Sequence, residues 1–311
     1  MQDHWTLEDA PRQDGRTAVV TGANAGLGYE IALGLARLGA RVVLACRSLP
    51  RGEVAAERIR AAVPGADVVV RRLDLASLAS VRAFAGQVTQ ERDSLDLLVA
   101  NAGLMAVDRG RTEDGFEVQF GVNHLGHVAL AAHLLPLLRA TPGARVASMS
   151  SMGHRAGRID LDDLMGERRY RRWGAYFQSK LANLLFTAEL DRRLTAAGID
   201  VRAVAAHPGG SATDLGSEGT GLSNRLATRL VPLVLQSASA GALPMLRACT
   251  EPGVPGGAYF GPHLLGVGRP VRETPSRRAR DAAMARRLWD VSEELTGVRW
   301  DLPARDRRVV A

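Results

Sequence analysis

The chain has 311 residues, of which 46% are hydrophobic and 23% charged, as expected of a globular protein with a substantial buried core. Its net charge is +7, but the arginines are interspersed with acids and lack the aromatic interleaving of a nucleic-acid-binding surface. We therefore expect no nucleic-acid partner, and we interpret the basic cluster at residues 168–172 as a solvated loop.

Residues 1–14 contain several acids and no apolar segment, so we interpret them as an N-terminal extension and not as a signal peptide. The most apolar stretches, Val128–Leu138 and Leu230–Leu235, are far shorter than the ~20 residues of a membrane-spanning helix. This pattern predicts no membrane anchor. The two cysteines, Cys46 and Cys249, lie far apart and outside any metal-ligand spacing, which favours a reduced cytoplasmic setting.

Short apolar segments rich in β-branched residues alternate with helical patterns such as Glu30–Leu38 and Val81–Val88. Because these apolar segments do not alternate with polar residues, they indicate strands that are buried on both faces. The pattern predicts an α/β fold in which residues 1–311 form a single domain, a doubly wound parallel sheet (Rossmann fold) with helices on both faces. The six predicted strands are Thr17–Thr21, Val42–Ala45, Val68–Leu73, Leu95–Ala100, Arg145–Ser150 and Val201–Ala205.

After His207 the pattern becomes looser and richer in glycine and serine. We expect an apolar helical segment near Leu222–Ala248, a last strand at Ala258–Phe260 and a C-terminal helix near Arg277–Leu295. In α/β proteins, the segments that follow the carboxyl ends of strands bind substrate. We therefore interpret residues 209–250 as a substrate-binding or lid region and residues 271–311 as a C-terminal helix and tail.

A glycine-rich loop, Thr21-Gly22-Ala23-Asn24-Ala25-Gly26-Leu27-Gly28, follows the first predicted strand and opens the first helix. Glycines allow a tight turn and a close approach to a pyrophosphate, whose charge is met by free amides at the helix N-terminus. The position of the loop therefore predicts a nucleotide cofactor more strongly than a simple tight turn.

The end of the second strand reads Ala45-Cys46-Arg47-Ser48 and contains no carboxylate that could bind a ribose diol. Because arginine pairs well with phosphate, Arg47 predicts NADP(H) as the preferred cofactor, with NAD(H) as the alternative if Arg47 is only a surface residue.

Lys180 is the only lysine in the chain, and it follows Tyr176 by one helical turn. A compact ammonium can approach a phenol oxygen and sugar hydroxyls more closely than the planar guanidinium of arginine. We therefore interpret Tyr176 and Lys180 as a functional pair and not as a chance surface arrangement.

The chain contains a series of short motifs in a specific order: the Thr-Gly-x-x-x-Gly-x-Gly loop, Leu73-Asp74-Leu75, Asn101-Ala102-Gly103, Asn123, Ser150-Ser151, Tyr176-x-x-x-Lys180, and Pro208-Gly209 followed by Thr213. In this order they resemble the short-chain dehydrogenase/reductase family, particularly its branch of retinol dehydrogenases and protochlorophyllide reductases. The resemblance extends from Gly15 to Thr213, with a weaker similar stretch at Leu288–Ser292.

This resemblance implies four catalytic residues. Tyr176 is the general acid and base. Its phenol ordinarily has a pKa near ~10, and Lys180, together with oxidised nicotinamide, stabilises the phenolate and binds the nicotinamide ribose. Ser151 polarises the substrate oxygen and is chosen over Ser148 and Ser150 because the family uses the second of its paired serines. Asn123 holds a helix kink and a water of a proton relay; alternatively, it is a helix-interior asparagine that bonds to its own backbone.

The resemblance also implies that Asp74 contacts the adenine ring and that Thr213 contacts the nicotinamide carboxamide. Ala100 stands where the family often has a further asparagine, and the segment 153–173 is longer than in the smallest members. The full set of expected cofactor-binding residues is Gly22, Asn24, Gly26, Leu27, Gly28, Arg47, Asp74, Leu75, Asn101, Ala102, Gly103, Tyr176, Lys180, Pro208, Gly209 and Thr213.

We expect no metal site, because no carboxylate or cysteine completes a ligand set with His124, His127 or His154, and we assign these histidines structural roles. His207 is expected to be a buried hydrogen-bonding side chain. The apolar residues of 226–235 have helical periodicity, which fits a substrate cap, a core or the interface of a homo-oligomer equally well.

Together these features predict an NADP(H)-dependent oxidoreductase that transfers a hydride between nicotinamide and a lipophilic alcohol or carbonyl substrate. The alternative is a catalytically silent, dinucleotide-sensing regulatory protein, but such proteins usually lose the tyrosine or the lysine, and this chain has both. A methyltransferase with a similar glycine loop would explain neither residue.

Overall fold

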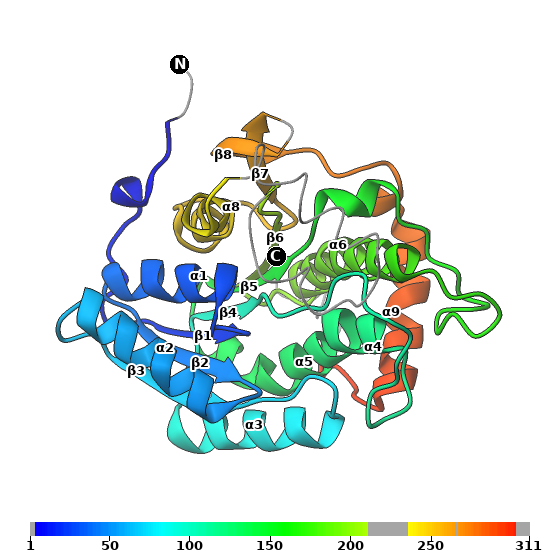
Figure 1. Cartoon of the computed structure of the whole chain (residues 1–311), viewed down its shortest axis with the longest axis horizontal. Coiled ribbons are helices and arrows are strands. Elements are labelled where there is room, and N and C mark those ends of the chain that lie inside the picture. The colour runs from blue at the N-terminus through cyan, green and yellow to red at the C-terminus, as the bar shows by residue number, and fades with distance from the viewer. Residues whose placement is uncertain (1–3, 211–235, 265, 303–311) are drawn as a thin grey trace, which may run out of the picture.

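The computed structural model describes residues 4–210, 236–264 and 266–302 and shows an eight-stranded sheet in the order β3-β2-β1-β4-β5-β6-β7-β8 (Figure 1). Neighbouring strands from β3 to β7 pair in parallel, and all six predicted strands are confirmed, with ends that differ by at most two residues. The parallel strands are β1 (Thr17–Thr21), β2 (Arg41–Cys46), β3 (Val68–Arg72), β4 (Leu97–Ala100), β5 (Ala144–Met149), β6 (Val201–Ala206) and β7 (Tyr259–Leu264).

The predicted last strand at Ala258–Phe260 is the beginning of β7, which continues to Leu264 and pairs with an antiparallel strand, β8 (Val267–Glu273). The sequence did not predict β8. Its pattern is weak because this edge strand contains a glycine and a proline and buries only Pro270 fully. The sheet is therefore doubly wound and parallel, as predicted, with one antiparallel edge.

Helices cover both faces of the sheet (Figure 1). Successive residues of β1 belong to opposite faces: Ala18 and Val20 pack in the hydrophobic cluster with α1, α2 and α8, and Val19 packs in the cluster with α3 and α5. The helices are α1 (Gly26–Arg37), α2 (Leu49–Ala62), α3 (Leu78–Glu91), α4 (Val118–Phe120), α5 (Gly126–Arg139), α6 (Arg172–Ala196), α8 (Ala238–Thr250) and α9 (Ala282–Thr296). The short helical turns are η1 (Leu7–Asp9), the π-helical η2 (Gly121–Leu125), η3 (Met152–Arg155) and η5 (Arg278–Arg280).

The ends of the chain differ in detail from the expectations. Trp5 of the N-terminal extension is only 6% exposed and belongs to the cluster around α1 and α8. The predicted C-terminal helix begins later, because Asp281 caps α9 and accepts hydrogen bonds from two of its amides. Of the apolar segment expected near Leu222–Ala248, residues 238–248 lie in α8, and residues 222–235 lie outside the described part of the chain.

None of the helices within the described ranges is long and apolar enough to cross a bilayer.

Arg145 connects β5 to the end of α8, and it gives a test of this packing. The buried side chain donates from Nη1 to the Ala248 carbonyl at 2.7 Å and from Nη2 to the Glu251 carbonyl at 2.7 Å. Arg145→Ala leaves the buried Ala248 carbonyl and the partly buried Glu251 carbonyl without these donors, so we expect a loss of about 2–4 kcal/mol in the free energy of unfolding, measured with urea. The exposed Arg37→Ala serves as the control and should change stability by less than ~0.5 kcal/mol. Equal effects of the two substitutions would contradict this role of Arg145.

Candidate active site

The glycine loop connects β1 to α1 in a backbone conformation that requires glycine. Gly22 and Gly26 have φ angles of 64° and 54°, in the left-handed region. A Cβ atom at Gly28 would overlap the carbonyl of Gly22 and lie 2.6 Å from Nδ2 of Asn101. No side chain caps α1, so the amides of its first turn are available to a ligand.

Thr21, directly before this loop, joins it to the segment after β4. Its Oγ1 accepts hydrogen bonds from the amides of Asn101 and Ala102, both at 2.9 Å. Nδ2 of Asn101 in turn donates to the Thr21 carbonyl at 2.9 Å. Thr21 was not among the site residues predicted from the sequence, although its position as the last strand residue before the first glycine was a usable signal.

A cleft of about 300 Å³ runs along the carboxyl ends of the strands. Gly209 adjoins a lining residue, and Thr213 lies outside the described residues. All the other expected cofactor-binding residues line the cleft: Gly22, Asn24, Gly26, Leu27, Gly28, Arg47, Asp74, Leu75, Asn101, Ala102, Gly103, Tyr176, Lys180 and Pro208.

Two further residues line the same cleft beside Arg47: Ser48, the N-cap of α2, and Arg51, in the first turn of α2. Both were missed in the sequence analysis, although Arg51 follows Arg47 by four residues at the start of α2. Asp74 is the only carboxylate among the described lining residues, and one of its oxygens accepts a hydrogen bond from the amide of Ala76 at 3.0 Å. Two guanidinium groups therefore face this end of the cleft.

Three of the four expected catalytic residues meet where β5 and α6 approach each other. Tyr176 and Lys180 are 7% and 4% exposed and lie one turn apart on α6. Ser151 follows β5 as the N-cap of η3, where its hydroxyl accepts from the amide of Gly153 at 3.1 Å, and it lies close enough to Tyr176 to offset part of the rise that burial causes in the pKa of the phenol. Nζ of Lys180 lies 5.7 Å from the centre of the Tyr176 ring and donates to the carbonyl of Met149 at 3.2 Å.

The neighbouring serines have other partners. Oγ of Ser150 donates to the carbonyl of Lys180 at 2.9 Å, and Ser148 is buried within β5. Ser151, which the sequence analysis selected, is thus the serine that the structure brings into contact with Tyr176.

Burial shifts the pKa values of both α6 residues. It raises the pKa of the Tyr176 phenol above its ordinary value, although the hydrogen bond with Ser151 acts in the opposite direction. The expected stabilisation of the phenolate by Lys180 concerns the complex with oxidised nicotinamide and stays a prediction. Burial also lowers the pKa of Lys180 to about 8. At neutral pH the phenol is protonated and the amine is still mainly charged.

Asn123 lies in the π-helical turn η2 and is completely buried. Its Oδ1 accepts from the amide of Leu104 at 2.7 Å, and its Nδ2 donates to the carbonyl of Leu104 and to Oγ of Ser179, both at 2.9 Å. The alternative of an asparagine that bonds to its own backbone is therefore wrong. A Cβ at Gly103 would lie 3.1 Å from Oδ1 of Asn123 and 3.2 Å from Nζ of Lys180, so this glycine allows close packing of both side chains.

The histidines form hydrogen bonds inside the fold. Nδ1 of His127 lies 3.1 Å from the Asn123 carbonyl, so it is the donor, and Nε2 accepts from the Thr21 hydroxyl at 2.9 Å. His124 bonds to Asn183 and Ser292. Among the described residues, no group of three or more His, Cys, Asp or Glu side chains could hold a metal ion.

His207 is buried, as predicted, and lies behind the cleft. Its Nδ1 accepts from the amide of Gly209 at 3.1 Å, so Nε2 is the donor to Oε1 of Glu273, also at 3.1 Å. A Cβ at Gly261 would overlap both partners of this pair. Glycine at position 261 therefore leaves the space that the His207–Glu273 pair fills.

Comparison with known proteins agrees with this geometry. The family model described as short chain dehydrogenase matches residues 16–220. Human retinol dehydrogenase 13 is 44% identical over 292 residues, covering 91% of this chain and 85% of the relative. Mouse retinol dehydrogenase 12 is 44% identical over 289 residues, covering 92% and 88%. The chain therefore belongs to the short-chain dehydrogenase/reductase family.

Solved structures give the same result. A crystal structure of an uncharacterized protein from Mycobacterium paratuberculosis has 46% identity and a TM-score of 0.81, covering 97% of this chain and all of that chain. The Pseudomonas aeruginosa RhlG/NADP active-site complex has 26% identity and a TM-score of 0.63, covering 80% and 95%. The protein is thus an oxidoreductase that uses a nicotinamide cofactor on an alcohol or carbonyl group, and the comparisons give no support to the regulatory alternative.

The buried Lys180 predicts a specific dependence of stability on pH. Its pKa is about 8 in the fold and 10.5 ordinarily, so the charged amine destabilises the folded state fully below pH 8. This penalty disappears as the pH rises through 10.5. We expect Lys180→Met to be more stable than the wild type at pH 7, by roughly 1–3 kcal/mol at ~1.4 kcal/mol per pKa unit.

Urea unfolding of both proteins at pH 7 and pH 10 measures this difference, and other titrating groups cancel between them. We expect the stability difference to be smaller at pH 10. A difference that is the same at both pH values would contradict the assigned cost of burying this amine.

Proposed function

We propose that the protein is an NADP(H)-dependent oxidoreductase acting on a lipophilic alcohol or carbonyl compound, with Asn123, Ser151, Tyr176 and Lys180 as its catalytic residues. The observation that carries this proposal is the contact between Ser151 and the buried Tyr176, one helical turn from the only lysine, beside a glycine-loop cleft.

The cleft fits a dinucleotide. Its glycines at positions 22, 26 and 28 expose backbone, and the uncapped start of α1 offers amides to a pyrophosphate. Asp74 would bind the adenine end, and Lys180 the ribose hydroxyls at the nicotinamide end. When bound, the nicotinamide supplies or accepts the hydride.

The side chains of this chain hold the substrate oxygen and move its proton. The hydroxyls of Ser151 and Tyr176 lie near each other, and a carbonyl oxygen placed between them can accept from both in place of their mutual contact. In reduction, Tyr176 donates its proton to this oxygen; burial keeps the phenol protonated until this step. The charge of Lys180 then favours the resulting phenolate, and its pKa of about 8 allows proton exchange near neutral pH.

Asn123 supports this arrangement from behind. It connects Leu104, beside the cleft, to Ser179, whose hydroxyl donates to the carbonyl of Tyr176 at 2.8 Å. In this proposal the π-helical turn fixes the position of the segment after β4 relative to α6, the helix that carries Tyr176. Asn123 would also hold the water of a proton relay.

The preference for NADP(H) over NAD(H) rests on Arg47, Ser48 and Arg51 at the end of β2. A ribose 2′-phosphate would meet two guanidinium groups there and no carboxylate of the first turn of α2. The NADP complex of the related RhlG structure supports the same cofactor.

The lipophilic character of the substrate rests on the names of the relatives, retinol dehydrogenases, and on Leu104, Val118, Val122 and Met149, which line the cleft. The apolar residues of 226–235 and Thr213 lie outside the described residues, and we still expect them to contribute to the substrate and nicotinamide sites. A cytoplasmic location is supported by the two cysteines, Cys46 and Cys249, which are both free and buried.

Tyr176→Phe tests the proposed chemistry. The substitution removes the proton donor and keeps the ring, so we expect kcat to fall at least ~1000-fold on any carbonyl substrate found in a panel that is screened by NADPH oxidation. Binding of NADPH, measured by fluorescence titration, should change less than ~3-fold. A Tyr176→Phe enzyme with full turnover would refute the mechanism.

Arg47→Asp tests the cofactor preference. A carboxylate at this position repels a 2′-phosphate and accepts hydrogen bonds from a ribose diol, so we expect the ratio of NADPH to NADH affinity to fall by ~100-fold or more. Fluorescence titration with both cofactors measures this ratio. Arg58→Asp on the outer part of α2 introduces the same change of charge outside the cleft and should leave the ratio nearly unchanged. An unchanged ratio in Arg47→Asp would contradict the assignment of Arg47.

A further inference from the structure

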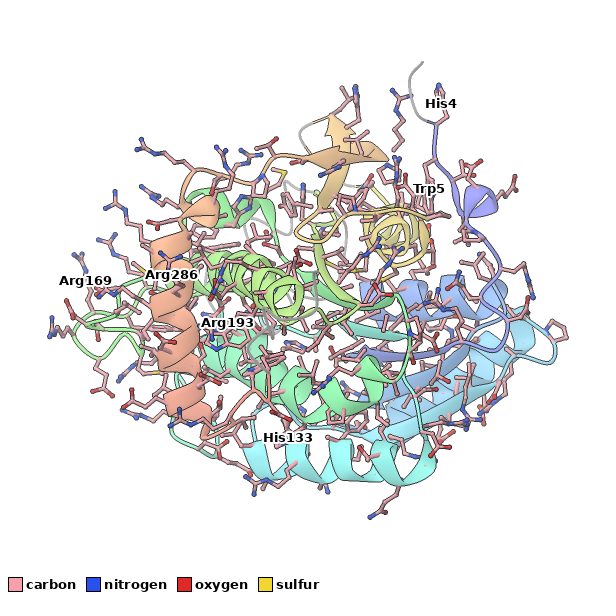
Figure 2. All side chains as sticks on the ribbon, turned by 180° about the vertical axis from the view of Figure 1, so that it is seen from behind. His4, Trp5, His133, Arg169, Arg193 and Arg286 are labelled. Carbon is pink, nitrogen blue, oxygen red and sulfur yellow. The ribbon has the colours of Figure 1, made fainter. Side chains whose placement is uncertain are left out.

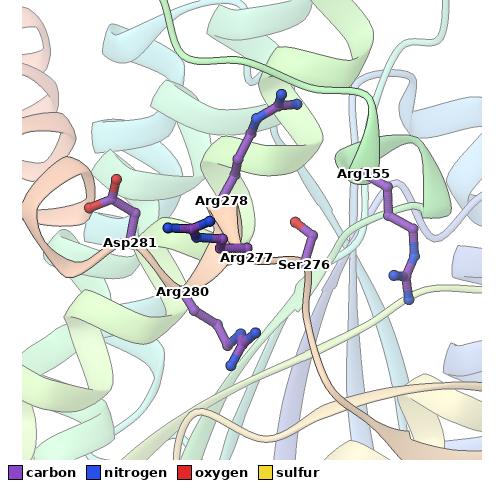
Figure 3. A pocket seen from close by; sticks show the side chains of 6 residues that line it. All are labelled: Arg155, Ser276, Arg277, Arg278, Arg280 and Asp281. Carbon is purple, nitrogen blue, oxygen red and sulfur yellow. The ribbon is translucent and has the colours of Figure 1, made fainter.

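A second hollow, of about 1000 Å³, lies outside the cofactor cleft and shares none of its lining residues. We call it the arginine hollow. Its lining consists of Arg155, Ser276, Arg277, Arg278, Arg280 and Asp281 (Figure 3).

The arginine hollow forms where two segments that are distant in sequence meet. Arg155 ends η3, the turn that begins directly after Ser151, and the other lining residues belong to the connection between β8 and α9. His154 joins the two segments, since its Nδ1 bonds to the Ser151 carbonyl at 2.7 Å and its Nε2 accepts from the amide of Ser276 at 3.3 Å. The hollow is therefore connected through His154 to Ser151 of the candidate active site.

The charges of this lining are poorly balanced. Four guanidinium groups accompany one carboxylate, Asp281, whose Oδ1 is already occupied by two amides at the start of α9, both at 3.0 Å. Arg155 lies 3.5 Å from Glu273, and Arg278 donates to the Gly157 carbonyl at 3.1 Å.

Arg277 and Arg280 lack such partners. Both are exposed, and within the described parts of the chain neither guanidinium has a hydrogen bond or an ion pair. Figure 3 shows Arg155 and Arg280 on the two sides of Ser276, Arg278 extending away from Arg280, and Arg277 extending toward the side of Asp281. The Ser276 hydroxyl accepts only a long bond from the amide of Ala279, at 3.4 Å, and its proton is available to a ligand.

Several guanidinium groups around one hollow repel each other unless an anion lies among them. Guanidinium forms paired hydrogen bonds with phosphate oxygens, and a hydroxyl adds a further donor. The width of the hollow and the number of positive charges favour a group with two or more negative charges over a single carboxylate.

We propose that the arginine hollow is a binding site for phosphate groups, distinct from the cofactor cleft, in which Arg277, Arg280 and Ser276 are the principal ligands and Arg155 is a further one. Two sources share this chemistry: a soluble phosphate ester and the headgroup of an anionic phospholipid.

The test compares two double variants that each remove two positive charges near α9. Arg277→Gln/Arg280→Gln removes the unpartnered charges of the arginine hollow. Arg286→Gln/Arg287→Gln is the matched control, because both arginines are exposed on α9 outside the hollow, and Arg286 is marked in Figure 2. Urea unfolding establishes that both variants fold.

Isothermal titration with inorganic pyrophosphate is then made on the wild type and both variants. We expect pyrophosphate to bind in the glycine-loop cleft as well, with the same contribution in all three proteins, because none of the substitutions lies in that cleft. We expect the second, hollow-specific binding event to weaken at least ~10-fold in Arg277→Gln/Arg280→Gln and less than ~2-fold in the control. Equal binding in both variants, or a single binding event in the wild type, would overturn the proposal.

Sedimentation with vesicles distinguishes the two sources. If vesicles of phosphatidylglycerol bind the wild type and the control more strongly than they bind Arg277→Gln/Arg280→Gln, and phosphatidylcholine vesicles bind none of them, the hollow takes a lipid headgroup. If only pyrophosphate discriminates, it takes a soluble ester. Vesicle binding that is the same in both variants, together with unchanged pyrophosphate binding, would refute both forms of the proposal.

Discussion

The hydroxyl of Thr21 connects three segments that form the candidate active site: the glycine loop, the segment after β4 and the π-helical turn. It accepts from two successive amides after β4 and donates to His127, which in turn donates to the carbonyl of Asn123. Burial lowers the pKa of His127 to about 4, so the ring stays neutral and keeps one donor and one acceptor nitrogen. The glycine loop, the segment after β4 and the π-helical turn are thus fixed relative to one another by a single side chain.

The π-helical turn is also bonded to α6 through Asn123. Asn123 bonds to Leu104 at the cleft and to Ser179. Ser179 lies in α6 between Tyr176 and Lys180, directly before the lysine. An uninterrupted series of hydrogen bonds therefore joins the loop proposed to bind pyrophosphate to the helix proposed to carry out proton transfer. Buried polar groups in such a series stabilise one arrangement because every alternative leaves a donor or acceptor unpaired.

Much of the fold could be predicted from the sequence, since strands such as β1 and β5 are buried on both faces and consist of continuous apolar runs. The glycine loop could also be predicted from the sequence. Its backbone adopts angles that favour glycine, such as the positive φ of Gly22 and Gly26, so the conformation leaves a visible pattern in the sequence. β8 and η2 could not be read, since one is a half-exposed edge strand and the other depends on contacts with distant segments. The raised phenol pKa of Tyr176 has the same origin: burial is a property of the packed chain and not of a local motif.

The unpredicted strand β8 has a consequence for the serine side of the site. Its end supplies Glu273 to His207, and the connection that follows supplies the amide of Ser276 to His154. These two histidines bond to the Gly209 amide and the Ser151 carbonyl, and both contact the Tyr259 ring, with ring centres 5.3 and 5.6 Å from it. Glu273 and Ser276, at and after the end of β8, therefore stabilise two parts of the site through these histidines. His207 fixes the proposed nicotinamide edge of the cleft at Gly209, and His154 fixes the turn that carries Ser151. Because Ser276 also lines the arginine hollow, an anion bound there would contact the same residues, so the proposed phosphate site is physically connected to the position of Ser151, the serine proposed to be catalytic.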